Sequence, residues 1–244
     1  SDFGKTWNFL ETPQEITFWY NVDISDDGNI IGAVAHNSDS YVRVYVSMNA
    51  GQDWTQVTDV INPKNIRISS TGKDMYVVGT YSFFRSSDFG ESWTSVMSSS
   101  SYWKDLAVSN DGQKIMIGGT NLVPIVHTVD GGNSWQESDS NYQVQGLAAS
   151  NSGEKVIFLT NGEIKKSTNA GQSWKNLMGP SITRFPVVVA SDGEGENVFV
   201  GFRQGYIYSY GELGIPKIDL GSNIVNSSSS VSFSAFVNTD HTRR

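Results

Sequence analysis

The chain has 244 residues, a formal net charge of −8 and no cysteine. This length suits one large all-β domain with its own core, and the acidic balance argues against a nucleic-acid backbone as partner. The lack of cysteine excludes disulfides and thiolate metal sites, and no apolar run is long enough for a membrane helix, so we expect no membrane insertion.

A pattern of Ser/Thr-x-Asp/Asn-x-Gly-x-x-Trp, termed the box below, recurs along the chain. Complete copies occupy residues 47–54, 86–93, 128–135 and 167–174, and a truncated copy occupies residues 2–7. Successive box tryptophans are separated by 47, 39, 42 and 39 residues. That spacing is typical of one four-stranded propeller blade.

The residue types of the box predict a tight turn followed by a buried anchor. A Ser or Thr hydroxyl and an Asp or Asn oxygen can bond to nearby backbone groups, glycine supplies a positive φ, and tryptophan buries a large apolar area. We therefore expect structural roles for Asp2, Trp7, Ser47, Asn49, Gly51, Trp54, Ser86, Asp88, Gly90, Trp93, Thr128, Asp130, Gly132, Trp135, Ser167, Asn169, Gly171 and Trp174.

A second pattern, an apolar strand that ends in serine before a glycine turn, shares this period. Its serines are Ser25, Ser69, Ser109, Ser150 and Ser191, which lie 44, 40, 41 and 41 residues apart. Second strands are expected at residues 30–35, 75–79, 115–118, 156–159 and 198–202, and third strands at 42–47, 82–86, 124–128, 163–167 and 206–209. Such alternating runs between short polar turns are typical of antiparallel meanders.

Together these patterns predict an all-β propeller of five four-stranded antiparallel blades over residues 1–220. Residues 6–10 would be the fourth strand of the last blade and close the ring, because a radial array otherwise leaves exposed edges. The alternative is a fragment of a six- or seven-bladed propeller. A degenerate sixth box begins at Ser209, and residues 215–220 could be a competing or outer strand. Residues 221–244 form a Ser-rich tail in which residues 231–237 could add an edge strand.

The boxes resemble the Asp box, or BNR repeat, of sialidases, the sortilin family, xyloglucan-degrading glycoside hydrolases and the photosystem II assembly-factor family. The resemblance implies that each box lies on the turn between the third and fourth strands, away from any active site. It favours an extracellular or cell-surface location. No P-loop or dinucleotide motif is present, and we expect no cofactor. Because these families differ in activity, it does not identify the function.

The opposite face would therefore carry any ligand. Its connections contain aromatics and single charges that suit stacking on sugars or docking of a peptide, although aromatics there can also pack between blades. The candidates are Trp19, Tyr20, His36, Tyr41, Arg43, Tyr81, Tyr102, Trp103, Asp105, Tyr142, Arg184, Arg203 and Tyr206.

Within this set, Arg43, Arg184 and Arg203 would meet at one rim if the ring closes, and could bind a carboxylate or sulfate. Sialidases use an arginine triad in this way, but their Phe/Tyr-Arg-Ile-Pro motif is absent, and residues 184–186 do not match it. Solvated surface arginines are the alternative interpretation.

Catalytic signals are weak. Glycoside hydrolysis needs two carboxyl groups about 5 to 10 Å apart. No repeat singles out such a pair among Glu15, Asp105, Glu137 and Asp139. Asp23 and Arg67 occupy equivalent places in their first strands and could pair, and such a pair would be structural. His36 and His127 are isolated, so we predict no metal site.

The sequence therefore favours a non-catalytic recognition module, with a carbohydrate or glycan ligand ahead of a protein partner. One alternative is a sialidase-like or xyloglucanase-like glycoside hydrolase. The other is a protein assembly or stability factor that resembles the photosystem II family.

Overall fold

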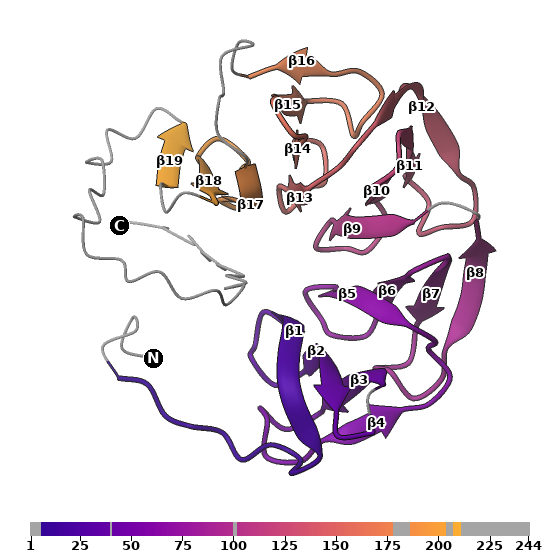
Figure 1. Ribbon diagram of the computed structural model, residues 1–244, viewed down its shortest axis with the longest axis vertical. Helices are drawn as coiled ribbons and strands as arrows, with labels where there is room; N and C mark the ends of the chain where they lie inside the picture. Colours follow the sequence, from indigo (N-terminus) through magenta and orange to yellow (C-terminus); the bar gives the residue numbers. More distant parts are fainter. Residues whose placement is uncertain (1–5, 40, 100–101, 178–185, 204–206, 211–244) are drawn as a thin grey trace.

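A computed structural model describes residues 6–39, 41–99, 102–177, 186–203 and 207–210. These residues form five antiparallel sheets and contain no helix. The sheets are arranged as blades around a centre, with the first strand of each blade innermost and the last strand outermost (Figure 1). The predicted all-β propeller with five blades is confirmed.

Each blade is built from consecutive strands. Blade 1 contains β1 (Ile16–Ile24), β2 (Ile31–Asn37), β3 (Val42–Ser47) and β4 (Thr55–Val57). Blade 2 contains β5 (Pro63–Ile68), β6 (Met75–Gly79), β7 (Ser82–Ser86) and β8 (Thr94–Ser98). Blade 3 contains β9 (Trp103–Val108), β10 (Ile115–Gly119), β11 (Val123–Thr128) and β12 (Gln136–Tyr142). Blade 4 contains β13 (Gly146–Ala149), β14 (Val156–Leu159), β15 (Ile164–Ser167) and β16 (Lys175–Asn176). Blade 5 contains β17 (Pro186–Ser191), β18 (Val198–Phe202) and β19 (Ile207–Tyr210).

The structure differs from the sequence-based expectation at the fourth strand of blade 5. Residues 6–10 belong to no strand, and blade 5 has three strands in its described part. The side chains of Trp7 and Phe9 are 88% and 106% exposed, so they do not supply the burial that a fourth strand of blade 5 requires. Leu10 instead lies close to Gly51 of blade 1. The first and fifth blades stand at the two ends of the arc, and the expected closure between them is not observed in the described residues (Figure 1).

The remaining C-terminal expectations lie outside the described residues. These are the degenerate sixth box that starts at Ser209, residues 215–220, the Ser-rich tail of 221–244 and the edge strand of 231–237. The division into residues 1–220 and 221–244 stays a prediction.

The hydrophobic core lies between neighbouring blades rather than within any one of them. Tyr76 and Phe83 of blade 2 are fully buried with their rings nearly parallel, at an interplanar angle of 8°. The box tryptophan of blade 3, Trp135, meets Phe83 edge-on with the ring centroids 5.4 Å apart. Trp93 of blade 2 likewise packs against the apolar cluster shared by blades 1 and 2. Trp93, Trp135 and Trp174 therefore pack on the clusters that hold successive blades together, whereas Trp54 contacts Trp19 of its own blade and Trp7 is exposed.

The four complete boxes fold into the same turn. The hydroxyl oxygens of Ser47, Ser86, Thr128 and Ser167 accept the N–H groups of Gly51, Gly90, Gly132 and Gly171 at 2.8, 2.9, 3.1 and 2.9 Å. The same hydroxyls donate to the side-chain oxygens of Asn49, Asp88, Asp130 and Asn169. In three copies the indole N–H of Trp54, Trp93 or Trp135 donates to the carbonyl of the box glycine. The truncated copy is described only from Thr6 onward, so Asp2 lies outside the described residues.

Each box turn also contains a left-handed residue that the motif did not predict. The residue before the box glycine, which is Ala50, Phe89, Gly131 or Ala170, has φ values of 56, 62, 69 and 51°. Its N–H donates to the carbonyl of Asn29, Lys73, Gln113 or Glu154, just before the second strand of the same blade. In the three copies where this residue is Ala or Phe, the bond offsets the steric cost of the left-handed backbone. In all four copies it ties the box turn to the turn between the first and second strands.

Replacement Trp93→Ala should lower the free energy of unfolding by about 3 kcal/mol, because it removes an indole packed between two blades. Urea denaturation followed by circular dichroism measures this loss. The control Arg203→Ala changes an exposed side chain just after β18 and should stay within about 0.5 kcal/mol of the wild type. Equal losses in the two variants would contradict the assignment of Trp93 to the core.

Candidate functional site

The face opposite the box turns, termed the loop face, carries the turns between second and third strands and the connections between blades. Backbone hydrogen bonds hold these segments together. Thr80 N–H donates to the Asn62 carbonyl at 3.1 Å, and Trp103 N–H donates to the Thr80 carbonyl at 3.2 Å. The connection into blade 2, a turn of blade 2 and the connection into blade 3 are thereby joined into one preformed surface.

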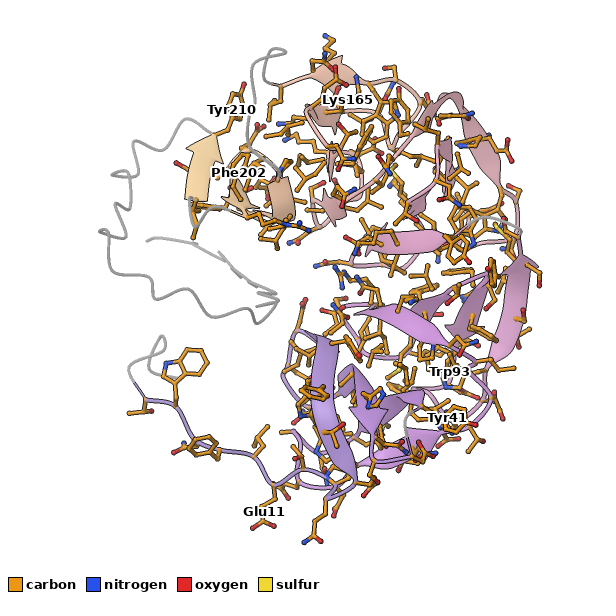
Figure 2. The ribbon with its side chains drawn as sticks, viewed as in Figure 1. Glu11, Tyr41, Trp93, Lys165, Phe202 and Tyr210 are labelled. Carbon is orange, nitrogen blue, oxygen red and sulfur yellow. The ribbon has the colours of Figure 1, made fainter. Side chains whose placement is uncertain are left out.

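A groove of about 410 Å³ lies at the outer part of this face, where blade 1 leads into blade 2. One wall is the start of β3, and the other is the end of β4 with the connection that follows it. Tyr41 and Ile61 are 59% and 66% exposed at its mouth, and Tyr41 lies at the periphery of the arc (Figure 2). The lining residues are Tyr41, Arg43, Gln56, Thr58, Val60, Ile61 and Asn62.

Arg43 is the cation of this groove, and its guanidinium is held in place by two neighbours. It lies 4.6 Å from the centroid of the Tyr41 ring, and its Nη2 is 3.5 Å from Oδ2 of the half-exposed Asp39. A guanidinium stacked on an aromatic ring keeps donors available for a carboxylate. The groove therefore combines one oriented cation with aromatic, aliphatic and amide groups.

An aromatic pair continues this surface onto blades 2 and 3. The ring centroids of Tyr81 and Tyr102 are 4.8 Å apart, and both side chains are 45% exposed. A hydrogen bond with Tyr102 raises the pKa of the Tyr81 hydroxyl. Thr80, which precedes Tyr81, bonds to Asn62 of the groove, so the turn that carries Tyr81 starts beside it. We call Tyr41, Arg43, Ile61, Asn62, Tyr81 and Tyr102 together the rim patch.

Trp19 and Tyr20, two further candidates, are 41% and 48% exposed, and the contacts of Trp19 give the reason for its exposure. Trp19 contacts Tyr45 and Trp54, with ring centroids 6.3 and 5.4 Å away. Tyr45 alternates along β3 with Val44 and Val46, which pack against blade 2, so Trp19 lies on the other side of blade 1. In the described part of the chain no preceding blade covers that side. The exposure of Trp19 therefore reflects the end position of its blade.

Trp103 and Tyr142 are taken up by packing. Trp103 is 5% exposed and belongs to the cluster between blades 2 and 3. Tyr142 packs edge-on against Phe158 of blade 4, with the centroids 4.8 Å apart. The sequence left open whether these aromatics bind a ligand or pack between blades, and Trp103 and Tyr142 pack between blades.

Asp105 joins three blades instead of facing a ligand. It is buried, and its carboxylate accepts the N–H groups of Leu106 and Leu147 at 2.9 and 2.8 Å. Asn65 of blade 2 donates to the same carboxylate. The Arg67 guanidinium stands 3.7 Å away, so Arg67 contacts Asp105 and not its expected partner Asp23.

Asp23 performs the corresponding task between blades 1 and 2, since its Oδ2 accepts the N–H of Ile68 at 2.7 Å. Burial raises the pKa of Asp23 to about 6, and the charge of Arg67 opposes part of that rise. Burial also raises the pKa of Asp105. A raised carboxyl pKa can mark a catalytic acid, but the oxygens of these two carboxylates are engaged by backbone groups.

The other candidate carboxylates show no catalytic arrangement in the described residues. Glu15 and Glu137 are exposed, and the side chain of Asp139 is not described. His36 lies with Nδ1 3.1 Å from the Thr17 hydroxyl, and the pKa of the buried His127 is lowered by burial. Within the described ranges, no three His, Asp or Glu side chains gather as metal ligands would.

The expected arginine rim does not form among the described residues. Arg43 lies in blade 1 and the exposed Arg203 in blade 5, at opposite ends of the arc. Arg184 and Tyr206 lie outside the described residues. An anion site shared by these arginines would need blades 1 and 5 to be neighbours in a closed ring.

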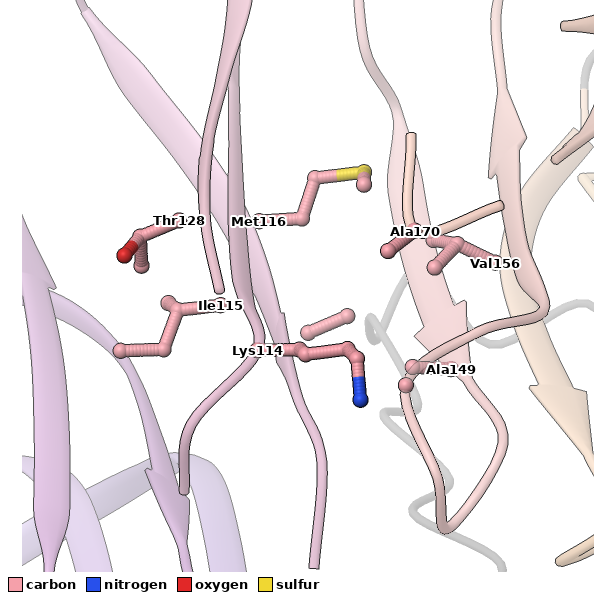
Figure 3. A pocket seen from close by; sticks show the side chains of 9 residues that line it. Lys114, Ile115, Met116, Thr128, Ala149, Val156 and Ala170 are labelled. Carbon is pink, nitrogen blue, oxygen red and sulfur yellow. The ribbon is translucent and has the colours of Figure 1, made fainter. Parts of the chain in front are cut away.

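A second hollow, between blades 3 and 4, is too small for a ligand. Its volume is about 10 Å³, room for at most one water molecule, and Met116, Ala149, Val156 and Ala170 are among its lining residues (Figure 3). No helix that could cross a bilayer occurs in the described part of the chain.

No family model matches this sequence, and no curated protein is significantly similar to it. Solved structures do share its fold. A chain of a nidogen/laminin complex aligns with a TM-score of 0.61 at 11% identity, covering 78% of this chain and 74% of that chain. YCF48 bound to D1 peptide aligns with a TM-score of 0.62 at 15% identity, covering 86% and 70%.

Two glycoside hydrolases are also similar. An ancestral GH74 enzyme aligns with a TM-score of 0.62 at 17% identity over 78% of this chain. The GH74 enzyme of Niastella koreensis aligns with a TM-score of 0.60 at 17% identity over 80%. The aligned region covers 29% and 30% of those two enzymes. At these identities the similarity shows the propeller fold and not the activity.

Sequence reasoning missed one wall of the groove. Gln56, Thr58, Val60, Ile61 and Asn62 lie between the box tryptophan of blade 1 and β5, in a stretch that has no repeated pattern. Only the early end of β4 and the path of the following connection bring them beside Tyr41 and Arg43.

The pKa of Asp23 predicts a stability change between about pH 7 and pH 4. Because the folded-state pKa of about 6 exceeds the ordinary aspartate value of 3.8, the folded protein binds the proton more tightly, and this group adds stability as the pH falls. A shift of this size corresponds to at most about 3 kcal/mol. Asp23→Asn keeps an oxygen for Ile68 and should remove that gain.

Urea denaturation at several pH values between 7 and 4 measures the effect, with the exposed Asp26→Asn as a matched control that should retain the wild-type slope. Asp88 changes the stability in the opposite sense at lower pH. Hydrogen bonds from Ser92 and Ser86 lower its pKa to about 2, so its contribution to the free energy of unfolding is lost as the pH falls. An Asp23→Asn variant with unchanged pH dependence would contradict the role of Asp23.

Proposed function

We propose that this chain is a non-catalytic recognition module that binds a partner protein through the rim patch on its loop face. The observation that carries the proposal is the patch itself. The exposed Tyr41 and Ile61 line a groove with an oriented guanidinium, and the half-exposed Tyr81 and Tyr102 follow on segments that backbone hydrogen bonds join to Asn62 of that groove.

This composition matches what protein interfaces use. Tyrosine and arginine are enriched at binding hot spots, and a preformed surface loses less conformational entropy on association. The comparisons are compatible with this function, since two similar structures are a nidogen/laminin complex and YCF48 bound to D1 peptide. The repeated box geometry supports an Asp-box propeller and leaves the opposite face for recognition.

A glycan ligand, the first choice from sequence, receives less support. Stacking on a sugar needs an accessible ring face, but Tyr81 and Tyr102 are tilted at 55° against each other, and Trp103 is buried. The hydrolase alternative needs two placed carboxyl groups, and Asp105 is occupied by backbone donors. Glycan binding is therefore kept as an outcome of the test below.

The double variant Tyr81→Ala/Tyr102→Ala should reduce partner binding about tenfold or more, because it removes two exposed aromatics from the patch. Affinity capture from an extract of the source organism, quantified by mass spectrometry, identifies the partner, and titration of the purified partner by calorimetry gives the affinity ratio. Because neither side chain belongs to an interblade core cluster, the variant should keep the wild-type melting temperature.

The matched control is Val129→Ala, which removes a 50% exposed apolar side chain from a box turn on the other face. It should bind like the wild type. Equal weakening by the control and the double variant would contradict the loop-face assignment. Specific binding on a glycan array that is lost with the double variant would replace the protein partner by a sugar.

A further inference from the structure

At its start, β3 forms fewer backbone pairs with the outer strand of its blade than the third strands of blades 2 and 3 do. The fifth residue before the box hydroxyl is Val42, Tyr81 or Val123 in the first three blades. In blade 2 the Tyr81 carbonyl accepts the N–H of Ser99 at 2.8 Å, and in blade 3 Val123 pairs with Tyr142. In blade 1 the outer strand ends with Val57 opposite Val44, so Val42 lies beyond the last pair.

The backbone of Val42 faces this open edge. The Tyr41 carbonyl accepts the N–H of Asn37 in β2 at 3.0 Å, and in an antiparallel pair the hydrogen-bonding direction alternates along the strand. Tyr41 and Arg43 therefore direct their polar groups toward β2, and Val42 directs its N–H and carbonyl outward. In the described part of the chain the Val42 carbonyl receives a long bond of 3.5 Å from Nη1 of Arg43.

The groove of about 410 Å³ lies along this same edge. We propose that it accepts an extended segment of the partner protein, which adds beside β3 as a short outer strand and continues the line that β4 leaves at Val57. Strand addition supplies backbone hydrogen bonds for affinity and side-chain pockets for specificity. The inference rests on the proposed protein-binding function and specifies how the partner is held.

The groove also defines the chemistry of the segment. Arg43 is its cation, so a carboxylate side chain complements it, and bidentate bonding would draw the guanidinium away from Asp39 and from the Val42 carbonyl. That movement exposes the carbonyl to an N–H of the incoming strand. Val60 and Ile61 offer an apolar wall for an aliphatic residue on the same face of the segment. We therefore assign an extended, acidic and aliphatic segment as the occupant.

Amide hydrogen exchange at Val42 tests this pairing directly. Peptides would be selected on the full chain from a random displayed dodecapeptide library, and the selected peptide would serve as the probe. In the free protein Val42 N–H should exchange fast, and in the complex about tenfold or more slowly. Arg43 N–H, which is directed toward β2, is the internal control and should be protected in both states.

N-methylation of the peptide provides a second measurement that leaves the protein unchanged. Because strand residues alternate in direction, methyl groups on every second amide should abolish binding, and those between them should not. Arg43→Ala should weaken binding about tenfold by removing the charged partner, whereas Arg203→Ala should not. Failure to select peptides, or selected peptides that leave Val42 exchange unchanged, would overturn the inference.

The failure of strand addition and the failure of the proposed function give different results. If the natural partner still loses affinity on Tyr81→Ala/Tyr102→Ala while Val42 exchange stays unchanged, the rim patch binds by side chains alone. If neither the partner nor the selected peptides depend on the loop face, the proposed function fails as well.

Discussion

One backbone hydrogen bond near the centre fixes each blade to the next, and the regularity of the fold depends on it. The N–H groups of Asp26, Ser70, Asn110 and Asn151 donate to the carbonyls of Ser70, Asn110, Asn151 and Gly193 at 2.9, 2.8, 2.8 and 2.7 Å. All lie in the turn that follows a first strand. Each turn must therefore present a donor and an acceptor at the same place, which constrains its backbone.

In blades 1 to 4 the serine that follows the first strand meets this constraint. The hydroxyl oxygens of Ser25, Ser69, Ser109 and Ser150 accept the N–H of the residue five positions later at 3.0, 3.1, 2.9 and 3.2 Å. That bond lies inside the turn between the first and second strands. The left-handed residue of the box turn donates its N–H to a carbonyl of the same turn. The two sequence patterns share one period because they build two halves of one hydrogen-bonded unit.

This coupling explains how far the sequence predicts the structure. Strands bounded by Ser25 or by the Ser86 box were placed correctly because their ends are fixed by local bonds, which a short pattern encodes. The fourth strand expected at residues 6–10 does not form, because Trp7 stays 88% exposed and Leu10 lies close to Gly51 of blade 1, a tertiary arrangement that the truncated box does not specify. Trp103 and Asp105 were assigned to the ligand face for a similar reason, since their exposure depends on the neighbouring blades.

The rim patch was predicted only in part, and the reason lies in what a repeat can encode. Tyr41, Arg43, Tyr81 and Tyr102 are visible as residues suited to binding, but the groove exists because β4 stops at Val57 while β3 starts at Val42. A repeated pattern predicts what the blades share, whereas a site that binds one partner depends on what a single blade does differently. Relative to blades 2 and 3, blade 1 departs at its outer edge, where in the described residues the pairing of β3 with β4 ends at Val44 and Arg43 lines the groove beside it. An unpaired strand edge is a liability for association unless it is used or covered, and its position beside the exposed aromatics of the loop face is the physical basis for linking it to recognition.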